Sequence, residues 1–468
     1  MSSMVPVSFE RMRWLNVTHM VLRRTRTALL AGLSGVSILL AGCGGDNSAS
    51  VADAQLDPTS GVTIQAAMFS DPPPQAALDA FTKSTGITVK WTAWDWDKLQ
   101  AKIMDTTRAK TYFADVTDVD WSRVGQLSRL YAFYPMEQFL DTKALSSDVP
   151  QLTSFTSGGH VIGIPYDASF DVVTINTSMF AKAGITAEPT TMAAYTDALR
   201  TIRSRGIAEH PLNIPFAAAE GLSTYWYQLT AAFGGSVLDD KHKAHFADPA
   251  SPGYKAAQWM VDAYTSGLVP PGNLDVADSQ GEQTLMAKGL VASTFGDYSG
   301  IIGTLYDLPA SSSVVHQVAY LAPPGVSGPS VNNSNPDGVG VPITAKYPRA
   351  AAKFIVWFTS AQNQAEFAGL DGPDKAMPNY SLPSHLSAVQ QLADKGQLIG
   401  GQQLIGMLKN SSRPIFPTGA PSWYPQFSQA VYTHLHAAAA GSETVDAAMK
   451  AIAATTDRLS ARVMTVGD

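Results

Sequence analysis

Apolar and polar residues beyond position 60 follow the pattern of a strand, a helix and a second strand. Residues 62–68 alternate in the way of a β-strand, and a run of three prolines then breaks the chain. Ala77, Leu78 and Phe81 mark a short helix that Gly86 ends, and residues 87–91 predict the second strand. Because all three elements fit within about 30 residues, the pattern favours a parallel sheet.

The rest of the chain continues this alternation of strands and helices. Strands are predicted at residues 115–119 and 171–176, and a buried helix at 350–358. A helix with Thr190 as N-cap is predicted from a stripe of apolar residues: Met192, Tyr195, Leu199 and Ile202. A last helix has the stripe Val445, Ala448, Met449, Ile452 and Leu459. The fold class is therefore α/β, without internal repeats.

The N-terminal region has the pattern of an export signal. Cations at Arg23, Arg24 and Arg26 precede the apolar residues 28–40, a stretch too short to span a bilayer, which needs about 20 residues. The segment 40–43, Leu-Ala-Gly-Cys, resembles the bacterial lipobox, which implies a signal peptide at 1–42 and a lipid anchor on Cys43. An uncleaved signal anchor is the alternative.

The segment after Cys43 is small and polar, which predicts a flexible tether over residues 43–60. The residues before Val21 are unlike a normal signal start, so the true start is Met1 or Met20. A lipid-anchored Cys43 would hold the protein at the cell envelope, on the outer face of the cytoplasmic membrane or in the periplasm.

Composition excludes several classes of protein. Of the 468 residues, 45% are hydrophobic and 15% are charged. From residue 44 onward the chain has 27 Lys and Arg residues and 38 Asp and Glu residues, and this negative net charge argues against a nucleic-acid surface. The single cysteine excludes disulfides, a cysteine-based zinc site and a two-cysteine redox centre. The pairs His242/His245 and His434/His436 are expected at the surface, and we expect neither a metal nor a cofactor.

Motifs of common enzymes are missing from the sequence. It has no Gly-x-Ser-x-Gly elbow, no Gly-Lys phosphate loop and no His-Glu-x-x-His. Asp118 and Asp120 could mimic the carboxylate pair of a glycosidase, which only their separation would test. We therefore expect a protein that is not an enzyme.

A series of short motifs resembles family 1 of the bacterial extracellular solute-binding proteins, the capture subunits of ABC importers, whose best-known type binds maltose. The motifs lie at residues 81–89 (Phe-Thr-Lys-Ser-Thr-Gly-Ile-Thr-Val), 114–116, 163–166 (Gly-Ile-Pro-Tyr), 175–185, 189–191, 348–355 and 443–449. Each motif alone is weak, but their order covers nearly all of residues 62–460.

The resemblance implies a two-lobed periplasmic-binding-protein fold, with a multi-crossing hinge and an interlobe ligand cleft. By family order lobe one is expected at 60–168 plus 323–372, and lobe two at 169–322 plus 373–468. The ligand would be a small-molecule carbohydrate, and the partners would be the transmembrane subunits of an ABC permease. We expect a monomer.

A sugar needs planar hydrogen-bonding groups for its hydroxyls and flat rings for its faces. This chain has both where strands are predicted to end, the edge at which open α/β sheets bind ligands. The candidate ligand-binding residues are Ser70, Asp71, Asp118, Asp120, Trp121, Tyr166, Asp167, Ser169, Tyr225, Trp226, Asp297, Tyr298, Trp423 and Tyr424.

Some of these candidates rest on the resemblance. Ser169 falls near a position where relatives place an acid, and residues 296–298 match a family "G-x-W" loop whose ring stacks on the ligand, with Tyr298 in place of tryptophan. Tyr225 and Trp226 belong to a run of three aromatics that cannot all face one way on a helix.

Other ligands remain open at this stage. A glycerophosphodiester would need cations such as Arg123 or Arg413. A polyamine would use Asp118, Asp120 and Asp297 with an aromatic box. A surface enzyme acting on glycans is a third alternative, which turnover of a bound sugar would reveal.

Overall fold

The computed structural model describes residues 58–277, 279–368, 382–416 and 419–464. The predicted signal peptide at 1–42, the lipidation site Cys43 and all but the last three residues of the predicted tether lie outside these ranges. In the described ranges, no helix combines the length and the apolar character needed to cross a bilayer.

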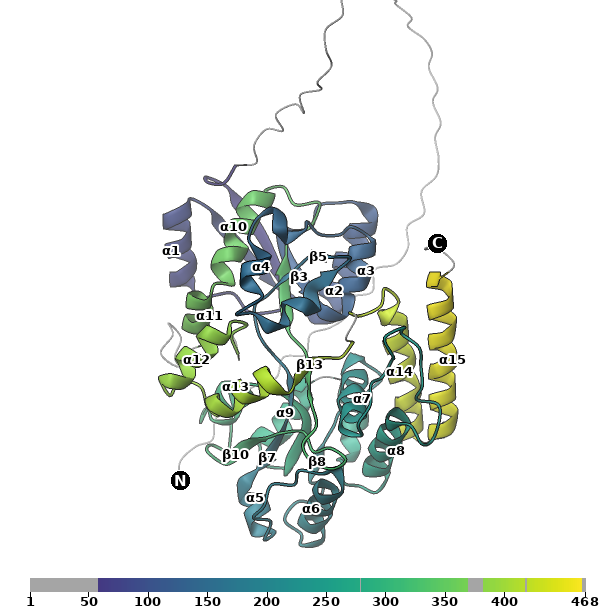
Figure 1. Cartoon of the computed structure of the whole chain (residues 1–468). Coiled ribbons are helices and arrows are strands. Elements are labelled where there is room, and N and C mark those ends of the chain that lie inside the picture. The colour runs from purple at the N-terminus through teal and green to yellow at the C-terminus, as the bar shows by residue number, and fades with distance from the viewer. Residues whose placement is uncertain (1–57, 278, 369–381, 417–418, 465–468) are drawn as a thin grey trace, which may run out of the picture. The chain divides into compact units, whose positions relative to one another are not determined.

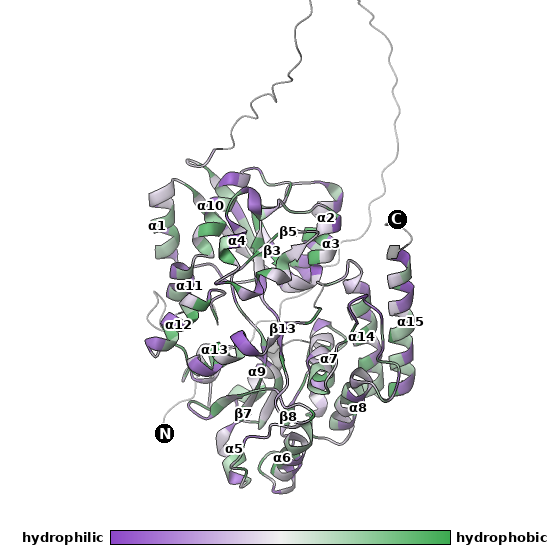
Figure 2. Cartoon of the chain, viewed as in Figure 1, coloured by the Kyte–Doolittle hydropathy of each residue, from purple (hydrophilic) through white to green (hydrophobic). Residues whose placement is uncertain are grey.

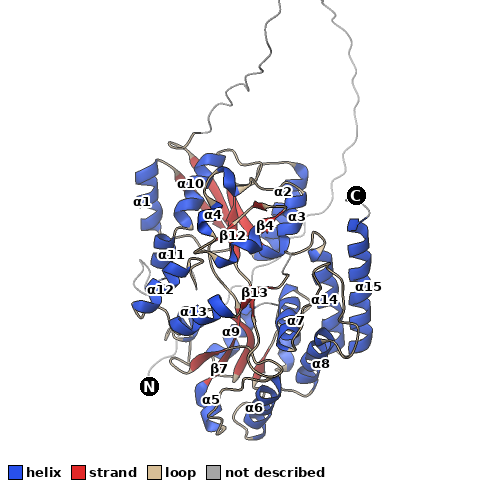
Figure 3. Ribbon diagram, in the orientation of Figure 1, coloured by secondary structure: helices blue, strands red, loops and turns tan. Residues whose placement is uncertain are grey.

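A five-stranded sheet forms the first half of the fold, and its strands form one of the two main groups in Figure 3. Its order is β2-β1-β3-β12-β6. The strands are β1 (Thr63–Met68), β2 (Thr88–Ala93), β3 (Val116–Asp120), β6 (Ile164–Pro165) and β12 (Asp337–Gly340). β2, β1 and β3 are parallel, which confirms the predicted strand–helix–strand unit, and β12 is antiparallel to β3 and β6.

Helices cover both faces of this sheet because the strand side chains alternate between two apolar clusters. Ile64, Ala66 and Met68 pack with residues of α1 (Gln75–Thr85) and α10 (Pro348–Phe358). Ala67 belongs to the cluster that includes residues of α2 (Trp96–Ala109) and α3 (Val124–Arg129). Gly86 caps α1 with a positive φ of 73°, as its prediction as a helix end requires.

A four-stranded sheet forms the second half, in the order β10-β7-β9-β8. The strands are β7 (Asp171–Asn176), β8 (Leu212–Asn213), β9 (Ser293–Tyr298) and β10 (Val318–Leu321). The neighbouring helices are α5 (Thr177–Lys182), α6 (Met192–Ser204), α7 (Glu220–Ala232), α8 (Pro252–Thr265) and α9 (Ser279–Ala287). The N-cap of α6 is Thr191 and not the predicted Thr190, because the Thr191 side chain accepts from the Ala194 backbone N–H.

The C-terminal part is helical. Its helices are α11 (Ala361–Ala368), α12 (Leu386–Asp394), α13 (Gly401–Asn410), α14 (Tyr424–Ala439) and α15 (Val445–Met464). α14 packs against α7, α8 and α15. The predicted stripe on α15 is buried at Ala448, Met449 and Ile452, and hydrophilic and hydrophobic residues alternate along this helix in Figure 2.

Short elements complete the chain. They are η1 (Trp121–Arg123), η2 (Met136–Gln138), α4 (Thr142–Leu145), η3 (Pro150–Phe155), β4 (Thr156–Ser157), β5 (His160–Val161), η4 (Pro271–Asp275), η5 (Ile302–Tyr306), β11 (Asn332–Ser334) and β13 (Ser412–Pro414). Ile162 and Gly163 separate the short strands β5 and β6.

Two crossing segments join the sheets side by side (Figure 1). Residues 166–170 lead from β6 to β7, and residues 335–336 lead from β11 to β12. They run antiparallel, because Tyr166 N–H donates to Asp337 O at 3.0 Å and Asn335 N–H donates to Ser169 O at 2.9 Å. This pairing fixes the ends of both sheets next to each other.

Candidate functional site

The cluster of polar side chains at the crossing segments begins at Asp118 in β3. One Asp118 oxygen accepts from the Phe69 backbone N–H, and the other accepts from the Tyr166 hydroxyl at 3.1 Å. Phe69 directly follows β1, so Asp118 ties the ends of two parallel strands to the first crossing segment. We call Asp118, Tyr166, Asp167, Ser169 and Asp337 the crossing cluster.

Asp167 connects the two crossing segments within this cluster. Its Oδ1 accepts from the Asp337 backbone N–H at 2.8 Å, and its Oδ2 accepts from the Ser169 hydroxyl at 2.8 Å. Gln151 donates from its side chain to Ser169 O at 3.0 Å, which fixes the same backbone from η3. The cluster is therefore held by hydrogen bonds from three separate parts of the chain.

Burial changes the protonation of these carboxyl groups because the charged form loses its hydration. It raises the pKa of Asp118 to about 7, although the bonds from Phe69 and Tyr166 oppose the rise. Burial likewise raises the pKa of Asp167 to about 6. Desolvation and then the Asp167 charge raise the pKa of Asp337 well above its usual value. Near neutral pH these groups can both donate and accept hydrogen bonds.

The end of β1 supplies the adjacent candidates. The Ser70 hydroxyl is buried and has no hydrogen-bond partner among the described residues. Trp91 donates from its indole N–H to Ser70 O at 3.0 Å, and Asp71 beside it is exposed. Phe69, the residue directly after β1, is 39% exposed.

Aromatic rings gather next to the crossing cluster at η1. Trp121 donates from its indole N–H to Asn335 Oδ1 at 2.6 Å. Its ring lies 5.6 Å from the Tyr424 ring and 6.3 Å from the Phe416 ring, measured between centroids. Tyr424 begins α14, so this contact links the five-stranded sheet to a helix that packs with α7 of the other half.

Charged groups lie beside these rings. Asp120 accepts from the Trp96 indole N–H at 3.1 Å, and from the backbone N–H of Ser122 at 2.8 Å. The Arg123 guanidinium lies 5.4 Å from the centre of the Trp96 ring and 5.9 Å from that of Tyr424. Arg123 Nε is buried and has no hydrogen-bond partner among the described residues.

Glu220 faces this group from the start of α7. Its carboxylate accepts from the Tyr424 hydroxyl and, at 2.8 Å, from the Ser428 hydroxyl. Burial raises the pKa of Glu220, and the Arg123 charge opposes the rise. We call Trp96, Trp121, Arg123, Glu220 and Tyr424 the aromatic junction.

The end of β9 holds a second buried acid. Asp297 accepts from the hydroxyl of Thr174 at 2.8 Å and from that of Tyr306 at 2.6 Å, and burial raises its pKa to about 6. Asp171 is opposite Tyr298 in the β7–β9 pairing, and its pKa is raised well above the usual value by burial and by the Asp297 charge. Asp297 is fully buried, whereas Tyr298 is partly exposed.

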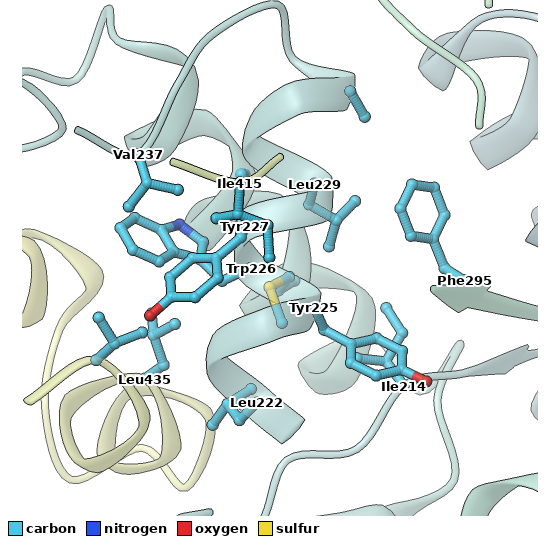
Figure 4. Close-up of a cluster of buried hydrophobic side chains, with 14 of the residues drawn as sticks. Ile214, Leu222, Tyr225, Trp226, Tyr227, Leu229, Val237, Phe295, Ile415 and Leu435 are labelled. Atoms are coloured by element: carbon cyan, nitrogen blue, oxygen red, sulfur yellow. The ribbon is translucent and has the colours of Figure 1, made fainter. Parts of the chain in front are cut away.

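Tyr225 points away from Trp226 and Tyr227, whose rings lie side by side on another side of α7, 5.7 Å apart between centroids (Figure 4). Tyr225 lies on the side of Ile214, and its ring packs against Gly296, where an added Cβ would come within 2.9 Å of the ring. Trp226 is fully buried, donates to Gly253 O at 2.8 Å and packs on Phe246. Trp226 is thus part of the core cluster, as is Tyr227.

Trp423 lies at the border of the same core. Its ring is edge-on to the His242 ring at 6.2 Å and to that of Phe427 at 6.0 Å. It precedes Tyr424, and it is buried. The structure therefore gathers the candidates of the five-stranded sheet and Tyr424. It buries Trp121, Tyr225, Trp226, Trp423 and Tyr424 in one apolar cluster, and Asp297 is fully buried as well.

Several polar residues of this region were missed by the sequence reading. Asn335, Asp337 and Glu220 come together with Trp121 and Asp167 only through the antiparallel crossing and the packing of α7. The composition of residues 322–338, rich in Gly, Pro, Ser and Asn, marked a loop but gave no position for a side chain.

Other places in the described chain offer less chemistry. A surface hollow of about 410 Å³ lies between α6 and α8 and is lined by Thr196, Arg200, Trp259 and Asp262 among others. Its Trp259 ring lies 6.1 Å from the ring of Phe295 in β9, measured between centroids. The described residues contain no group of three or more His, Cys, Asp or Glu arranged to hold a metal ion.

Comparison with known proteins decides the family. The profile of the bacterial extracellular solute-binding proteins matches residues 76–397. The chain belongs to this family. The family's members are binding proteins for transport, and its name places them outside the cytoplasm. Among curated proteins no sequence matches the chain.

Solved structures share the fold of this solute-binding protein. A maltose-bound MalE3 from T. maritima is 18% identical, with a TM-score of 0.72 over 85% of this chain and 100% of that one. A solute-binding protein from Agrobacterium radiobacter K84 in complex with ribitol is 21% identical, with a TM-score of 0.74 over 86% and 100%. One from Agrobacterium vitis S4 with bound D-mannitol is 20% identical, with a TM-score of 0.70 over 87% and 99%. The expected α/β periplasmic-binding-protein fold with two lobes is confirmed.

Proposed function

We propose that this protein is the substrate-binding lipoprotein of an ABC importer, and that it captures a carbohydrate between its two lobes for delivery to the permease subunits. The observation that carries this proposal is the junction of the sheets, where the crossing cluster and the aromatic junction lie together. Solved relatives of the same fold hold maltose, ribitol and mannitol. These ligands are neutral and rich in hydroxyl groups.

The division into lobes follows the strands. All strands of the five-stranded sheet fall within 60–168 plus 323–372, and all strands of the four-stranded sheet fall within 169–322. Residues 373–468 would complete lobe two, because α14 and α15 pack with α7 and α8. The crossing segments would then form the hinge, and the cleft would open where the sheets meet.

The ligand would contact groups from both lobes. From lobe one we propose Ser70, Asp71, Asp118, Asp120, Trp121, Tyr166 and Asp167, with Arg123 and Asn335 added, and Ser169 lies at the first position of lobe two. From lobe two we propose Tyr298, Tyr424 and Glu220. Rings of Trp121 and Tyr298 would stack on sugar faces, and the carboxyl groups would bind hydroxyls. Trp226, Asp297 and Trp423 would support the walls of the cleft, with Tyr225 behind the Gly296 turn.

The charges near the junction favour a neutral ligand over an anion. Arg413 is exposed and donates to the carbonyl oxygens of Ser412 and Asn410. Arg123 faces both Glu220 and Asp120, so its charge is already opposed. A glycerophosphodiester would therefore meet more carboxylates than cations.

A polyamine is disfavoured by the state of the buried acids. Such a ligand needs ionised carboxylates, whereas burial raises the pKa of Asp118 to about 7, so this carboxyl group is partly protonated at neutral pH. A partly protonated carboxyl group suits a hydroxyl better than an ammonium group, because it offers both a donor and an acceptor. A sugar or polyol is the ligand class that these groups match.

The rest of the function follows from the sequence and the family. A lipid on Cys43 would hold the protein at the outer face of the membrane as a monomer, after removal of residues 1–42. The protein would release its ligand unchanged, without catalysis. Closure of the lobes around the ligand would be the signal to the permease, since ligand binding favours a closed state that the empty protein populates little.

Isothermal titration calorimetry of the purified mature chain with neutral sugars and polyols tests this proposal. We expect saturable binding of one ligand class and recovery of that ligand intact. Asp120→Asn should weaken binding, whereas Asp262→Asn, an exposed acid on α8, should leave it unchanged. Conversion of the bound sugar to products would replace the transport function by an enzymatic one. A protein mass without lipid on Cys43 would contradict the anchor.

A further inference from the structure

The strands of the five-stranded sheet have a second set of ends, on the side of the sheet away from the crossing cluster. Thr63 of β1 pairs with Thr88 of β2, Ala66 pairs with Val116 of β3, and Gly340 pairs with Thr117. The N-terminal ends of β1, β2 and β3 and the C-terminal end of β12 therefore share one edge, which we call the outer edge. In Figure 1 the described chain begins, in purple, at this end of the sheet.

Exposed apolar side chains gather beyond the outer edge. Tyr131 is 82% exposed, Ile343 is 45% exposed and Leu130 is 39% exposed. They lie on neighbouring backbone, because Ile343 N–H donates to Ala132 O at 2.8 Å. Tyr131 adopts a φ of 49°, which is uncommon for a residue with a side chain and sets the turn after α3. A cluster of exposed apolar groups on a soluble surface indicates an interaction site.

Exposed cations also lie at the outer edge. They come from the C-terminal ends of α1, α2 and α3, from the turn between β12 and α10 and from the first turn of α10, and they are Lys83, Arg108, Lys110, Arg129, Lys346 and Arg349. Lys346 is fixed there, because its backbone N–H donates to Asp115 at 2.8 Å and its ammonium lies 4.1 Å from the centre of the Tyr112 ring.

The sign of this charge is opposite to that of the chain as a whole. From residue 44 onward the chain has 27 Lys and Arg residues and 38 Asp and Glu residues. In the same sheet Asp118, Asp120 and Asp337 lie at the other edge, beside the crossing segments. The exposed cations of the outer edge thus lie at the opposite strand ends from Asp118, Asp120 and Asp337, although Asp115, which accepts from Lys346, lies at the outer edge with them. Such a surface attracts an anionic partner.

The described chain also begins at this edge. Gly61 N–H donates to Gly86 O at 2.8 Å, directly before β1 and β2. Cys43 precedes Pro58 by fifteen residues. A chain of that length spans at most about 50 Å when extended and about 20 Å as a flexible coil. A lipid on Cys43 would therefore keep the outer edge within a short reach of the bilayer.

We propose that the outer edge is a membrane-contact surface that seats lobe one on anionic phospholipid. The cations would bind the headgroups, and Tyr131, Leu130 and Ile343 would enter the interface, where tyrosine is favoured. The inference rests on the lipid anchor of the proposed function. Its consequence is orientation: the edge that carries the crossing cluster points away from the lipid contact.

Spin labelling tests this surface on the lipidated protein reconstituted in vesicles. Cys43 is the only cysteine and would carry the lipid, so Tyr131→Cys introduces a single free thiol for a nitroxide. Ile343→Cys provides a second label at the same edge. Leu290→Cys is the matched control, because Leu290 is 56% exposed and lies directly before the four-stranded sheet's β9. The readout is collision with a water-soluble nickel chelate.

In vesicles that contain phosphatidylglycerol we expect several-fold lower collision with the chelate at positions 131 and 343 than at 290. Vesicles of phosphatidylcholine alone should reduce this difference. Reversal of two edge charges, Lys83→Glu with Arg129→Glu, should remove it, whereas Lys255→Glu with Lys288→Glu on the other half should not.

Equal accessibility of all three labels on anchored protein would overturn the membrane contact, and would leave sugar binding untouched. The same result would favour a protein as the partner of this surface, since the vesicles contain no other protein. A mass that shows Cys43 unmodified would instead remove the anchor, and with it both this inference and the lipoprotein part of the proposed function.

Discussion

Asp118 shows at the scale of one residue how the fold sets the chemistry of the junction. Its carboxyl group is buried between the end of β1 and the first crossing segment, and burial raises its pKa to about 7. An aspartate in the unfolded chain has a pKa of about 4. The folded state therefore holds this proton more tightly, so the stability from this group is full below about pH 4 and is lost as the pH rises through about 7.

Asp118→Asn should make unfolding less dependent on pH. The three-unit shift corresponds to at most about 4 kcal/mol between pH 4 and pH 7, and the variant should lose less free energy of unfolding than the wild type over this range. Urea denaturation at a series of pH values measures the difference. Asp71→Asn, at an exposed neighbouring acid, should follow the wild-type profile; identical profiles for Asp118→Asn and the wild type would contradict the burial argument.

Trp121 and Tyr298 are the rings that the proposal places against the ligand. Trp121→Ala and Tyr298→Ala should each weaken binding by more than about 1 kcal/mol, the scale of a lost stacked ring. Tyr131→Asn is the control, because Tyr131 is exposed at the outer edge and asparagine tolerates its positive φ. Calorimetric titration measures all three, and unchanged affinity in both site variants would remove these residues from the site.

The sequence located residues of the junction only where a local pattern marked a strand end. Asp118, Asp120 and Trp121 follow directly from the alternation that predicted β3. Glu220 and Asn335 lie 99 and 214 residues from Trp121 along the chain and come close through tertiary packing, which no local period encodes. Trp226 was a candidate ligand-binding residue because it is aromatic. Its indole N–H instead donates to Gly253 O, and its ring lies in the apolar core.

At the scale of elements, α3 is held against the segment before α14. An added Cβ on Gly125 would overlap the Ala420 carbonyl oxygen and come within 3.1 Å of Ser422 N. The absence of a side chain at Gly125 lets the two backbones approach, and this approach brings Trp121 to Tyr424. A glycine is therefore part of the geometry of the aromatic junction.

Gly125→Ala should lower the free energy of unfolding by about 1 to 3 kcal/mol, because the methyl group meets backbone that cannot rotate away. Gly406→Ala in α13 is the matched helical control: its Cβ meets nothing within 4 Å, so it should raise stability by about 0.5 to 1 kcal/mol. Chemical denaturation compares the two. A stabilising Gly125→Ala would show that α3 and the 420–422 segment are not in close contact.

Helices and strands could be predicted from the sequence where apolar residues repeat with one spacing over several residues. The alternation at 62–68 and the helical stripe at 77–81 gave β1 and α1, because each element buries one apolar face within a few residues. The segment 160–165 forms two short strands, β5 and β6, separated at Gly163, where an added Cβ would come within 2.8 Å of Val119. Close approach of backbone to a neighbouring strand is a tertiary constraint, so it left no signal in the local pattern.

At the scale of the whole molecule, the two sheets share one apolar cluster, and each sheet also has a cluster of its own. One apolar cluster includes Ala67 of β1, Val173 of β7 and Phe427 of α14, and so extends from one sheet to the other. Two further clusters, around Phe81 and around Phe170, each belong to one sheet.

The central claim is that a neutral sugar or polyol binds where the sheets meet, and thermal unfolding of the mature chain against a ligand panel tests it most directly. The panel contains mono-, di- and trisaccharides, polyols, amino sugars, glycerophosphodiesters and polyamines. A ligand at 100 times its Kd should add about 2.7 kcal/mol of stability. We predict a rise in Tm with a neutral sugar or polyol, and none with phosphodiesters or polyamines. Stabilisation by a phosphodiester or a polyamine, with every sugar and polyol without effect, would contradict the account.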